Sequence, residues 1–170
     1  MFFIEAGLDQ FKDIETPQEL YKVVTGMISY KHNGRFNTVD DVLKNKSGDC
    51  HDQSYLLQCA IRKMGYKTCR IFMVEYHDWG KAGGATHTLC WYVDKAKYFW
   101  IETAWGDQLG IHGPYKSIDE LKLDVLSKWN WSGDNDKLYM TSTSIKPPMS
   151  FGEFVERCTP EHEPKAYHKQ

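Results

Sequence analysis

The segment from Ser47 to Tyr76, SGDCHDQSYLLQCAIRKMGYKTCRIFMVEY, most constrains the fold. Apolar residues recur at helical spacing along its first half: Leu56, Leu57, Ala60, Ile61 and Met64. This spacing predicts a helix from Cys50 to about Lys63, which Gly65 ends. The following KTCRIFMVEY is rich in β-branched and aromatic residues, as strands are. The sequence therefore predicts a buried helix that begins at a cysteine and leads directly into a strand.

Three further helices are indicated by their capping residues. In TPQELYKVVTGMISY, Thr16 is placed to cap a helix and Glu19 completes a capping box, which predicts a helix to about Tyr30. Thr38 in the same way begins a short helix over TVDDVLKN, and Ser117 begins one over SIDELKLDVLSKW. Two helices thus precede the Cys50 helix and one follows it.

Strands are predicted over KTCRIFMVEY, THTLCWYVD and YFWIETAW, and the turn DKAK joins the last two. These three strands form an antiparallel sheet in this interpretation, and KLYMTSTS adds a strand further along the chain. The glycine-containing HDWGKAGGA, residues 77–85, is expected to be a surface loop, with a flap over substrate as the alternative. Helices followed by an antiparallel sheet with one inserted helix predict an α+β fold.

The turn DKAK also sets which residues oppose one another. If Asp94 pairs with about Lys97, His87 falls opposite about Ala104. Glu102 is then a diagonal neighbour of His87 on the same face of the sheet, about 7–8 Å away and within reach of a long side chain. A slip of one residue in the register would turn Glu102 to the other face.

The length bounds the number of domains. A chain of 170 residues is enough for one domain that buries roughly 70% of its unfolded surface. We expect a single domain over residues 1–170, with a core over about 16–146. The tail over about 147–170 is expected to hold one or two helical turns near FGEFVERC and then to fray.

Composition argues against several classes of partner. The chain has 21 basic and 23 acidic residues and a net charge of −2, so no strong field favours nucleic acid or a membrane surface. No stretch approaches the ~20 apolar residues of a membrane span, and the N-terminal residues lack the features of a secretion signal. The five cysteines show no disulfide-rich spacing. We therefore expect a reduced, cytoplasmic protein.

Three residues have the properties of a nucleophile, a base and an orienting acid. Cys50 stands at a helix N-terminus, where backbone N–H groups and the helix dipole favour a thiolate. His87 leads an apolar strand face that it shares with Leu89 and Trp91, and burying an imidazole there requires a partner. Glu102 is the one carboxylate in FWIETAW and can hold the imidazole in one tautomer.

These segments together resemble the transglutaminase-like superfamily of cysteine enzymes, from about residue 21 to about residue 121. Five positions match the pattern of that family: Gly48, Cys50, Gly65, Arg70 and His87. Glu102 stands where the family commonly has an aspartate followed by a proline. Asp107 is therefore kept as a reserve acid.

The resemblance implies a papain-like mechanism in which Cys50 attacks a carboxamide carbon, His87 transfers the proton and Glu102 orients His87. The substrate would be a protein or peptide, and the acyl group would pass to water or to an amine. No metal or organic cofactor is implied.

Further residues are candidates for binding substrate or the oxyanion. The oxyanion would be held by the Cys50 backbone N–H and one upstream donor, and the possible donors are Tyr30, His32 and Asn33. The candidates for the substrate-binding or oxyanion site are Tyr30, Asn33, Asp49, Trp79 and Trp105. Asp49 and Asp52 are also explained as charges that cap the helix.

Three other interpretations compete with this one. A catalytically silent binding domain on the same scaffold would need no reactive cysteine. An arylamine acetyltransferase uses the same triad order but needs a longer chain to hold acetyl-CoA. A metal site of Cys50, His51, His87 and Cys90 is disfavoured, because Cys90 should face the opposite side of its strand from His87.

Overall fold

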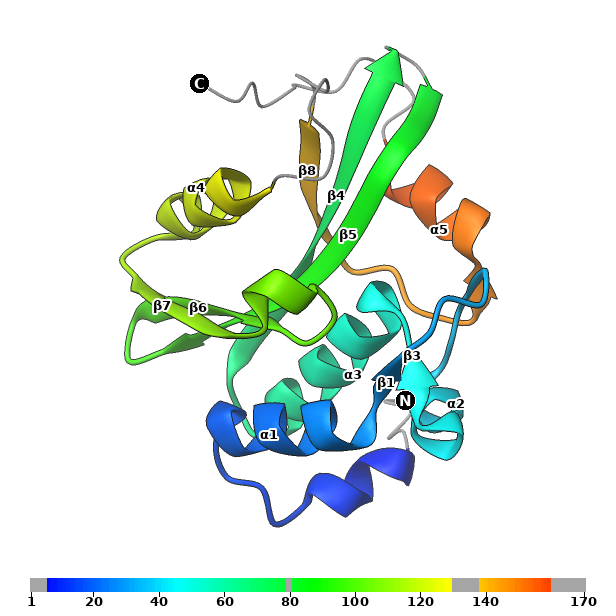
Figure 1. Cartoon of the computed structure of the whole chain (residues 1–170). Helices are drawn as coiled ribbons and strands as arrows, with labels where there is room; N and C mark the ends of the chain where they lie inside the picture. Colours follow the sequence, from blue (N-terminus) through cyan, green and yellow to red (C-terminus); the bar gives the residue numbers. More distant parts are fainter. Residues whose placement is uncertain (1–5, 79–80, 130–137, 160–170) are drawn as a thin grey trace.

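The computed structural model describes residues 6–78, 81–129 and 138–159 (Figure 1). The elements, in chain order, are η1 (Ala6–Phe11), α1 (Pro17–Met27), β1 (Ser29–Tyr30), β2 (Arg35–Phe36), α2 (Val39–Asn45), β3 (Ser47–Gly48), α3 (Cys50–Lys63), β4 (Lys67–Asp78), β5 (Lys81–Asp94), β6 (Lys97–Glu102), η2 (Gly106–Gln108), β7 (Gly110–Tyr115), α4 (Ile118–Lys128), β8 (Leu138–Thr143), β9 (Met149–Ser150) and α5 (Phe151–Cys158). Helices precede an antiparallel sheet that carries the inserted helix α4, which confirms the predicted α+β class.

The main sheet has five strands in the order β7-β6-β5-β4-β8, all antiparallel to their neighbours. Strand β7 was not anticipated, because its sequence GIHGPY reads as a turn. A proline is tolerated there because β7 is an edge strand. The sheet therefore extends one strand beyond the expected set on the side of β6.

Strands β4 and β5 form a long hairpin (Figure 1). The expectation of a loop over residues 77–85 was wrong at both ends, since β4 continues to Asp78 and β5 begins at Lys81. Backbone pairing needs no particular side chain, and two register shifts between Val74 and Asp78 accommodate the irregular sequence. Residues 79 and 80 lie outside the described part of the chain.

The turn between β5 and β6 has the predicted register. Asp94 pairs with Lys97 and Cys90 pairs with Ile101. Lys95 and Ala96 between them have φ values of 47° and 59°, the left-handed conformation that suits a two-residue hairpin turn. This register excludes the one-residue slip. Glu102 therefore lies on the same face of the sheet as His87, as predicted.

Helix α1 ends three residues earlier than predicted. Its N-terminus has the expected capping box between Thr16 and Glu19. After Met27 the chain leaves the helix because Ser29 and Tyr30 pair in parallel with Ser47 and Gly48 of β3. This pairing brings Tyr30 beside the residues that lead into α3.

Helix α3 begins at Cys50 and ends at Lys63, as predicted. Asp49 is its N-cap and forms a capping box with Asp52. A side chain at Gly48 would place its Cβ 2.7 Å from the Cβ of Asp52, so this approach requires glycine. Gly65 follows the helix with φ of 91°, which permits the sharp exit into β4. Both ends of α3 are therefore fixed by local sequence.

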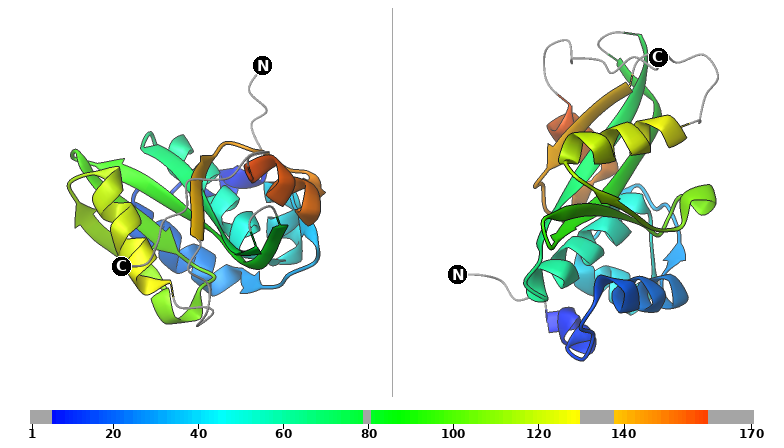
Figure 2. Two further views of the ribbon diagram at one scale, coloured as in Figure 1. Left: turned by 90° about the horizontal axis from the view of Figure 1, so that it is seen from above. Right: turned by 90° about the vertical axis from the view of Figure 1, so that its left-hand side faces the viewer.

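Two apolar cores lie on the two faces of the sheet. The views in Figure 2 place α4 and α5 on opposite sides of it. The first core joins the sheet to α1, α2, α3 and α5 and includes Leu20, Val24, Phe36, Leu56, Leu57, Ile61, Phe72, Val74 and Phe154. The second lies under α4 and includes Ile71, Met73, Leu89, Trp91, Trp100, Leu121, Val125 and Trp129. Successive residues of β4 alternate between the two cores, as strand geometry requires.

Arg70 on β4 is fully buried and connects three parts of the chain. Its Nε donates to the side chain of Gln58 on α3 and its Nη2 donates to the backbone carbonyl of Ile145. Its guanidinium lies 4.8 Å from the ring centroid of Tyr55. Arg70 therefore holds α3 and the segment before β9 against the sheet. Within the described residues, no helix has the length and apolar character needed to cross a bilayer.

Candidate active site

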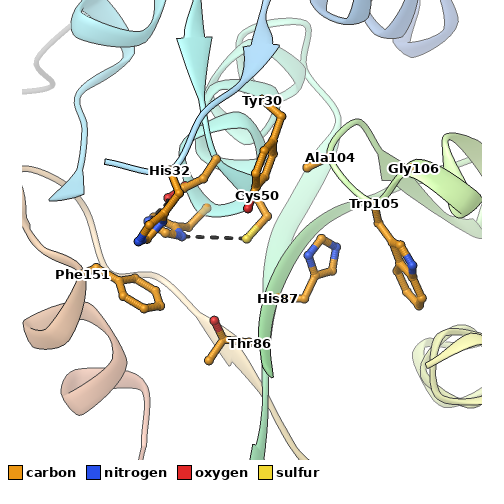
Figure 3. Close-up of a pocket in the computed structure, with 11 residues that line it drawn as sticks. Tyr30, His32, Cys50, Thr86, His87, Ala104, Trp105, Gly106 and Phe151 are labelled. Carbon is orange, nitrogen blue, oxygen red and sulfur yellow. Dashed lines mark hydrogen bonds and ion pairs between the residues drawn. The ribbon is translucent and has the colours of Figure 1, made fainter. Parts of the chain in front are cut away.

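Cys50 lies at the first turn of α3 and faces a pocket of about 450 Å³ (Figure 3). The pocket is lined by Tyr30, His32, Asp49, Cys50, His51, Thr86, His87, Ala104, Trp105, Gly106 and Phe151. These residues come from the segment after α1, the start of α3, the strand β5, the segment after β6 and the start of α5. Cys50 is only 8% exposed, so the pocket gives restricted access to its sulfur.

His87 and Glu102 form a buried pair. The Nε2 atom of His87 lies 2.5 Å from Oε2 of Glu102, and each side chain is 2% exposed. The other carboxylate oxygen accepts hydrogen bonds from the backbone N–H groups of Ala104 and Trp105, at 2.7 and 2.8 Å. The carboxylate is thus fixed on both oxygens, and Nδ1 is the ring atom of His87 left to interact with Cys50.

The pair is ionised near neutral pH. Burial lowers the pKa of His87, but the charge of Glu102 and hydrogen bonds with Cys50 and Glu102 outweigh it and raise this pKa to about 10. Burial raises the pKa of Glu102, but the charge and hydrogen bond of His87 outweigh burial and lower it overall.

Aromatic rings surround the His87 imidazole. The ring of Trp105 meets it edge to face, with centroids 5.5 Å apart, and Trp129 lies 6.3 Å away. The contact with Trp129 places His87 on the face of the sheet that holds Leu89 and Trp91, as predicted. These rings keep water from the ion pair, and charges attract more strongly where water is excluded.

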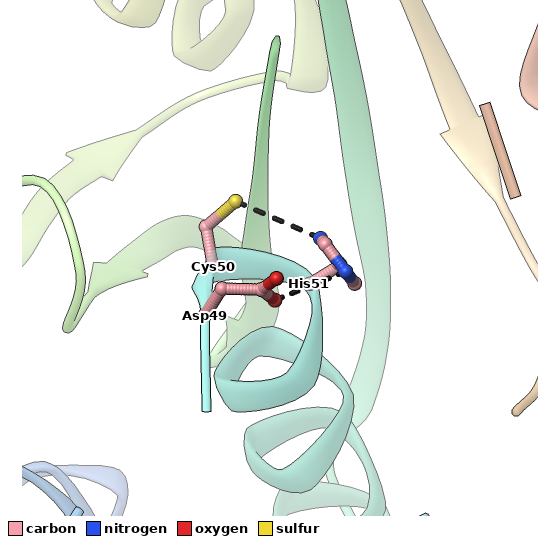
Figure 4. Close-up of side chains that lie close together, drawn as sticks. All are labelled: Asp49, Cys50 and His51. Carbon is pink, nitrogen blue, oxygen red and sulfur yellow. Dashed lines mark hydrogen bonds and ion pairs between the residues drawn. The ribbon is translucent and has the colours of Figure 1, made fainter. Parts of the chain in front are cut away.

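A second imidazole, His51, borders Cys50 on another side (Figure 4). Its Nδ1 lies 3.9 Å from the Cys50 sulfur, and its Nε2 lies 3.0 Å from Oδ1 of Asp49. The ring is stacked on Phe151 with centroids 5.1 Å apart and on Phe154 with centroids 5.2 Å apart. Burial lowers the pKa of His51 to about 3, so this imidazole is neutral. From the sequence alone, His51 is a candidate only for the disfavoured metal site.

Asp49 has a larger role than capping α3. Its Oδ2 lies 2.9 Å from Nδ1 of His32, and its Oδ1 accepts the backbone N–H of Asp52 as well as facing His51. Burial, and after it the charge of Asp52, raises the pKa of Asp49 to about 7. Asp49 therefore links the helix start to both His32 and His51.

The other predicted residues have different positions. Tyr30 lines the pocket, and partial burial together with Cys50 and Asp49 raises its pKa to about 12, so its hydroxyl remains a donor. The residues lining the pocket do not include Asn33, whose side-chain oxygen accepts from Arg35 and Asn37 within its own turn.

Asp107, the reserve acid, does not take part in the pair with His87. Asp107 lies on η2 and is exposed, and Glu102 is the acid that contacts His87. Trp79 lies outside the described residues. Trp105 lines the pocket, and its part in substrate binding stays a prediction.

Comparison with known proteins gives one match to a family and several to solved structures. The model of the Transglutaminase-like superfamily matches residues 6–132. Sixteen chains of solved structures match, and one is a Cytophaga hutchinsonii protein proposed to be a cysteine protease. It is 11% identical, with a TM-score of 0.41, and the alignment covers 95% of this chain and 52% of that one. This chain thus spans about half the length of that protein. No curated protein sequence matches.

Proposed function

Because this chain belongs to the transglutaminase-like superfamily, we propose that it is a cysteine-dependent hydrolase or acyltransferase that acts on amide bonds of proteins or peptides. The observation that supports this most is the buried His87–Glu102 ion pair, whose histidine lines the same pocket as Cys50. In this proposal Cys50 is the nucleophile, His87 transfers protons and Glu102 orients His87.

The first half-reaction would form a thioester. The Cys50 thiolate attacks the amide carbon, a C–S bond forms, and the C–N bond breaks as His87 gives its Nδ1 proton to the leaving amine. The developing oxyanion would accept hydrogen bonds from the Cys50 backbone N–H and the Tyr30 hydroxyl. The pocket position of Tyr30 and its high pKa support that assignment among the upstream donors.

The second half-reaction would release the acyl group. Water or an amine gives a proton to His87 and bonds to the acyl carbon, and the Cys50 thiolate leaves, which restores the charged pair. With water the enzyme is a protease or deamidase, and with an amine it is a transglutaminase. Throughout both steps Glu102 keeps the same hydrogen bond to Nε2 and stabilises the imidazolium.

The competing proposal is a binding domain without activity on the same scaffold. A protein that only binds a partner has no need to bury an ion pair beside a thiol, and burying charges is costly. The five free cysteines, Cys50, Cys59, Cys69, Cys90 and Cys158, support a location in the reducing cytoplasm. Neither nucleic acid nor a membrane forms part of this proposal, in line with the near-neutral charge.

Alkylation by iodoacetamide at pH 6, followed by peptide mapping, tests the state of Cys50. We expect Cys50 to be alkylated faster than free cysteine and faster than the other four thiols. In His87→Ala this excess rate of alkylation should disappear. Cys59→Ala is the matched control and should leave the excess unchanged, because Cys59 lies outside the pocket. A Cys50 rate no higher than that of free cysteine would favour the binding domain.

Activity is tested with casein, a glutamine donor peptide, and the same peptide with a primary amine. We expect hydrolysis, ammonia release or amine incorporation with the native protein and none with Cys50→Ala. The product that forms when the amine is present shows whether the acyl group passes to water or to the amine. If native protein and Cys50→Ala act alike on all three substrates, the proposal that this protein acts on protein or peptide amide bonds is wrong.

A further inference from the structure

Strand β8 forms one edge of the main sheet, next to β4 (Figure 1). Among the described residues it pairs with β4 alone, from Arg70–Thr143 to Glu75–Leu138, without a register shift. Its sequence, LYMTST, contains no charged residue, proline or glycine. Natural sheet edges are commonly protected from pairing with another chain by charges, prolines or bulges. Over Leu138–Thr143, β8 has none of these protections.

The opposite edge of the sheet is protected. Strand β7 contains Gly113 and Pro114, and its pairing with β6 has a register shift between Tyr98 and Trp100. A proline removes a backbone donor, and an irregular strand is a poor template for further pairing. The contrast between the two edges indicates that β8 is the edge suited to accept another strand.

The register of the sheet shows how the backbone bonds alternate. Asp94 and Lys97 flank a two-residue hairpin turn and are therefore a hydrogen-bonded pair, so even-numbered residues of β5 bond to β6 and odd-numbered residues bond to β4. In agreement, the carbonyl of Trp91 points to β4, where it accepts the hydroxyl of Thr68. Odd-numbered residues of β4 thus bond to β5, and even-numbered residues bond to β8.

The same alternation identifies the free backbone groups of β8. Arg70 pairs with Thr143, so odd-numbered residues of β8 bond to β4. In agreement, the carbonyl oxygen of Thr143 lies 3.7 Å from the sulfur of Cys69 on β4. The backbone N–H and C=O groups of Met140 and Ser142 therefore point away from the sheet.

A cavity flanks this edge on each face of the sheet. On the α4 face, a cavity of about 200 Å³ is lined by Asp119, Lys122, Leu123, Leu126 and Met140. On the α5 face, a cavity of about 340 Å³ is lined by residues 139 and 141–145 and by residues 157–159 at the end of α5. Side chains of a strand alternate between the two faces, so a strand added to β8 would direct them toward both cavities.

We propose that β8 of a second copy of this chain is the strand that pairs with this edge. The two β8 strands would run antiparallel about a two-fold axis and join the five-stranded sheets of both copies into one continuous sheet. Met140 of each copy would pair with Ser142 of the other, which satisfies the outward backbone groups of both residues. This interface does not depend on the proposed chemistry of Cys50.

The alternation within β8 supports a second copy as the partner. Leu138 and Met140 face the apolar core under α4, whereas Tyr139 and Thr141 face the α5 side. Opposed residues in an antiparallel pair lie on the same face, so a second β8 brings apolar side chains to the α4 face and hydroxyl groups to the α5 face. Because the strand carries no charge, the two copies do not repel each other at the axis.

The exposed face of α4 is also self-complementary. Leu123 is 64% exposed, and Asp119 and Lys122, of opposite charge, line the same cavity. A two-fold axis at β8 would bring this face toward its own copy in the opposite direction. Leu123 of the two copies would then lose contact with water, and Asp119 of each copy would face Lys122 of the other.

Sedimentation velocity of the full native chain over a range of concentrations tests the proposal. We expect monomer to convert to dimer as the concentration rises, without larger species, because a two-fold interface uses both β8 edges. In hydrogen exchange followed by NMR, the N–H groups of Met140 and Ser142 should exchange at least about 10-fold more slowly in the dimer.

Two variants weaken the interface at different points. Ser142→Pro removes an outward N–H and leaves the pairing with β4 in place, so we expect the dimer Kd to rise about 10-fold or more. Leu123→Lys should raise it by a similar factor, because it places a charge in the apolar contact. Val23→Lys is the matched control, since Val23 is an exposed apolar residue on α1, at the other end of the molecule from β8 (Figure 1), and it should leave the Kd unchanged.

Circular dichroism is recorded for each variant. If Ser142→Pro is unfolded, Ser142→Lys takes its place, because it sets like charges across the two-fold axis and should also raise the Kd. A native chain that stays monomeric at every concentration would overturn the proposal. If that monomer bound the synthetic peptide LYMTSTS, the edge would accept the strand of a different protein instead. An unchanged dimer Kd in the folded Ser142 variant would also overturn it.

Discussion

Glu102 sets the charge and the tautomer of His87 through one hydrogen bond. Its Oε2 faces Nε2 of His87, while its Oε1 accepts two backbone N–H groups. The second set of bonds prevents the carboxylate from turning away. The orientation of the imidazole toward Cys50 therefore depends on the acid that departs from the family pattern.

We predict that Glu102→Gln leaves the fold intact and removes most activity. The amide oxygen can still accept the N–H groups of Ala104 and Trp105, but the amide NH₂ would then donate to Nε2 and force the proton onto Nδ1 of a neutral ring. That tautomer cannot accept a proton at Nδ1, so we expect kcat/KM to fall about 10²- to 10⁴-fold. Kinetics with an unchanged circular dichroism spectrum check this.

The same variant tests the pH dependence of stability. The pKa of His87 is raised to about 10 in the folded protein from 6.5, so its stabilisation is complete below about pH 6.5 and is lost as pH rises through about 10. The lowered pKa of Glu102 gives stabilisation that is present above pH 4.5 and lost as pH falls through the folded pKa.

The difference in unfolding free energy between native protein and Glu102→Gln should therefore be largest between about pH 4.5 and 6.5 and shrink toward pH 10. Urea denaturation across this range measures it. A constant difference at every pH would mean that the pair is not ionised as described.

At the scale of elements, α4 attaches to the sheet through one face. Leu121 is fully buried in the core that contains Trp100 and Trp129, whereas Leu123 on the same helix is 64% exposed. The two leucines are two positions apart on the same helix, and one is buried while the other is exposed. They offer a matched pair for measuring what this face contributes.

We predict that Leu121→Ala lowers the free energy of unfolding by about 2–5 kcal/mol, because it removes buried methyl groups and leaves a cavity. Leu123→Ala should change it by no more than about 0.5 kcal/mol. Urea denaturation of both variants compares them. Equal effects would show that α4 does not pack on the sheet through Leu121.

At the scale of the whole molecule, the two cores share one sheet. Leu56 lies in the core on the α3 side and Leu121 in the core on the α4 side, and β4 contributes alternate residues to both. Loss of either core exposes one face of the same strands. We therefore expect the two sides to unfold together.

This expectation is tested with two probes. Among the described residues, Trp91, Trp100, Trp105 and Trp129 all belong to the α4 side, so the fluorescence of these four reports on that core, while far-ultraviolet circular dichroism reports on all helices. We predict that Leu56→Ala, with a cost of about 2–5 kcal/mol, moves the urea midpoint of both signals equally. If the fluorescence midpoint stays in place while the circular dichroism midpoint moves, the two cores unfold independently.

The sequence by itself determined the features that neighbouring residues encode. The limits of α3 follow from Asp49, Asp52 and Gly65, and the register that brings Glu102 to His87 follows from the turn at Lys95 and Ala96. Capping, periodicity and turn geometry act over a few residues, so they can be read along the chain.

Only the tertiary structure decided which other side chains reach the sulfur. Tyr30 reaches the pocket because β1 pairs with β3, and the His51 ring is fixed by Phe151 and Phe154, about a hundred positions away in sequence. Asn33, close to Tyr30 in sequence, is held in its own turn instead. Contacts between distant segments depend on how whole elements pack, and no local pattern of residues records that packing.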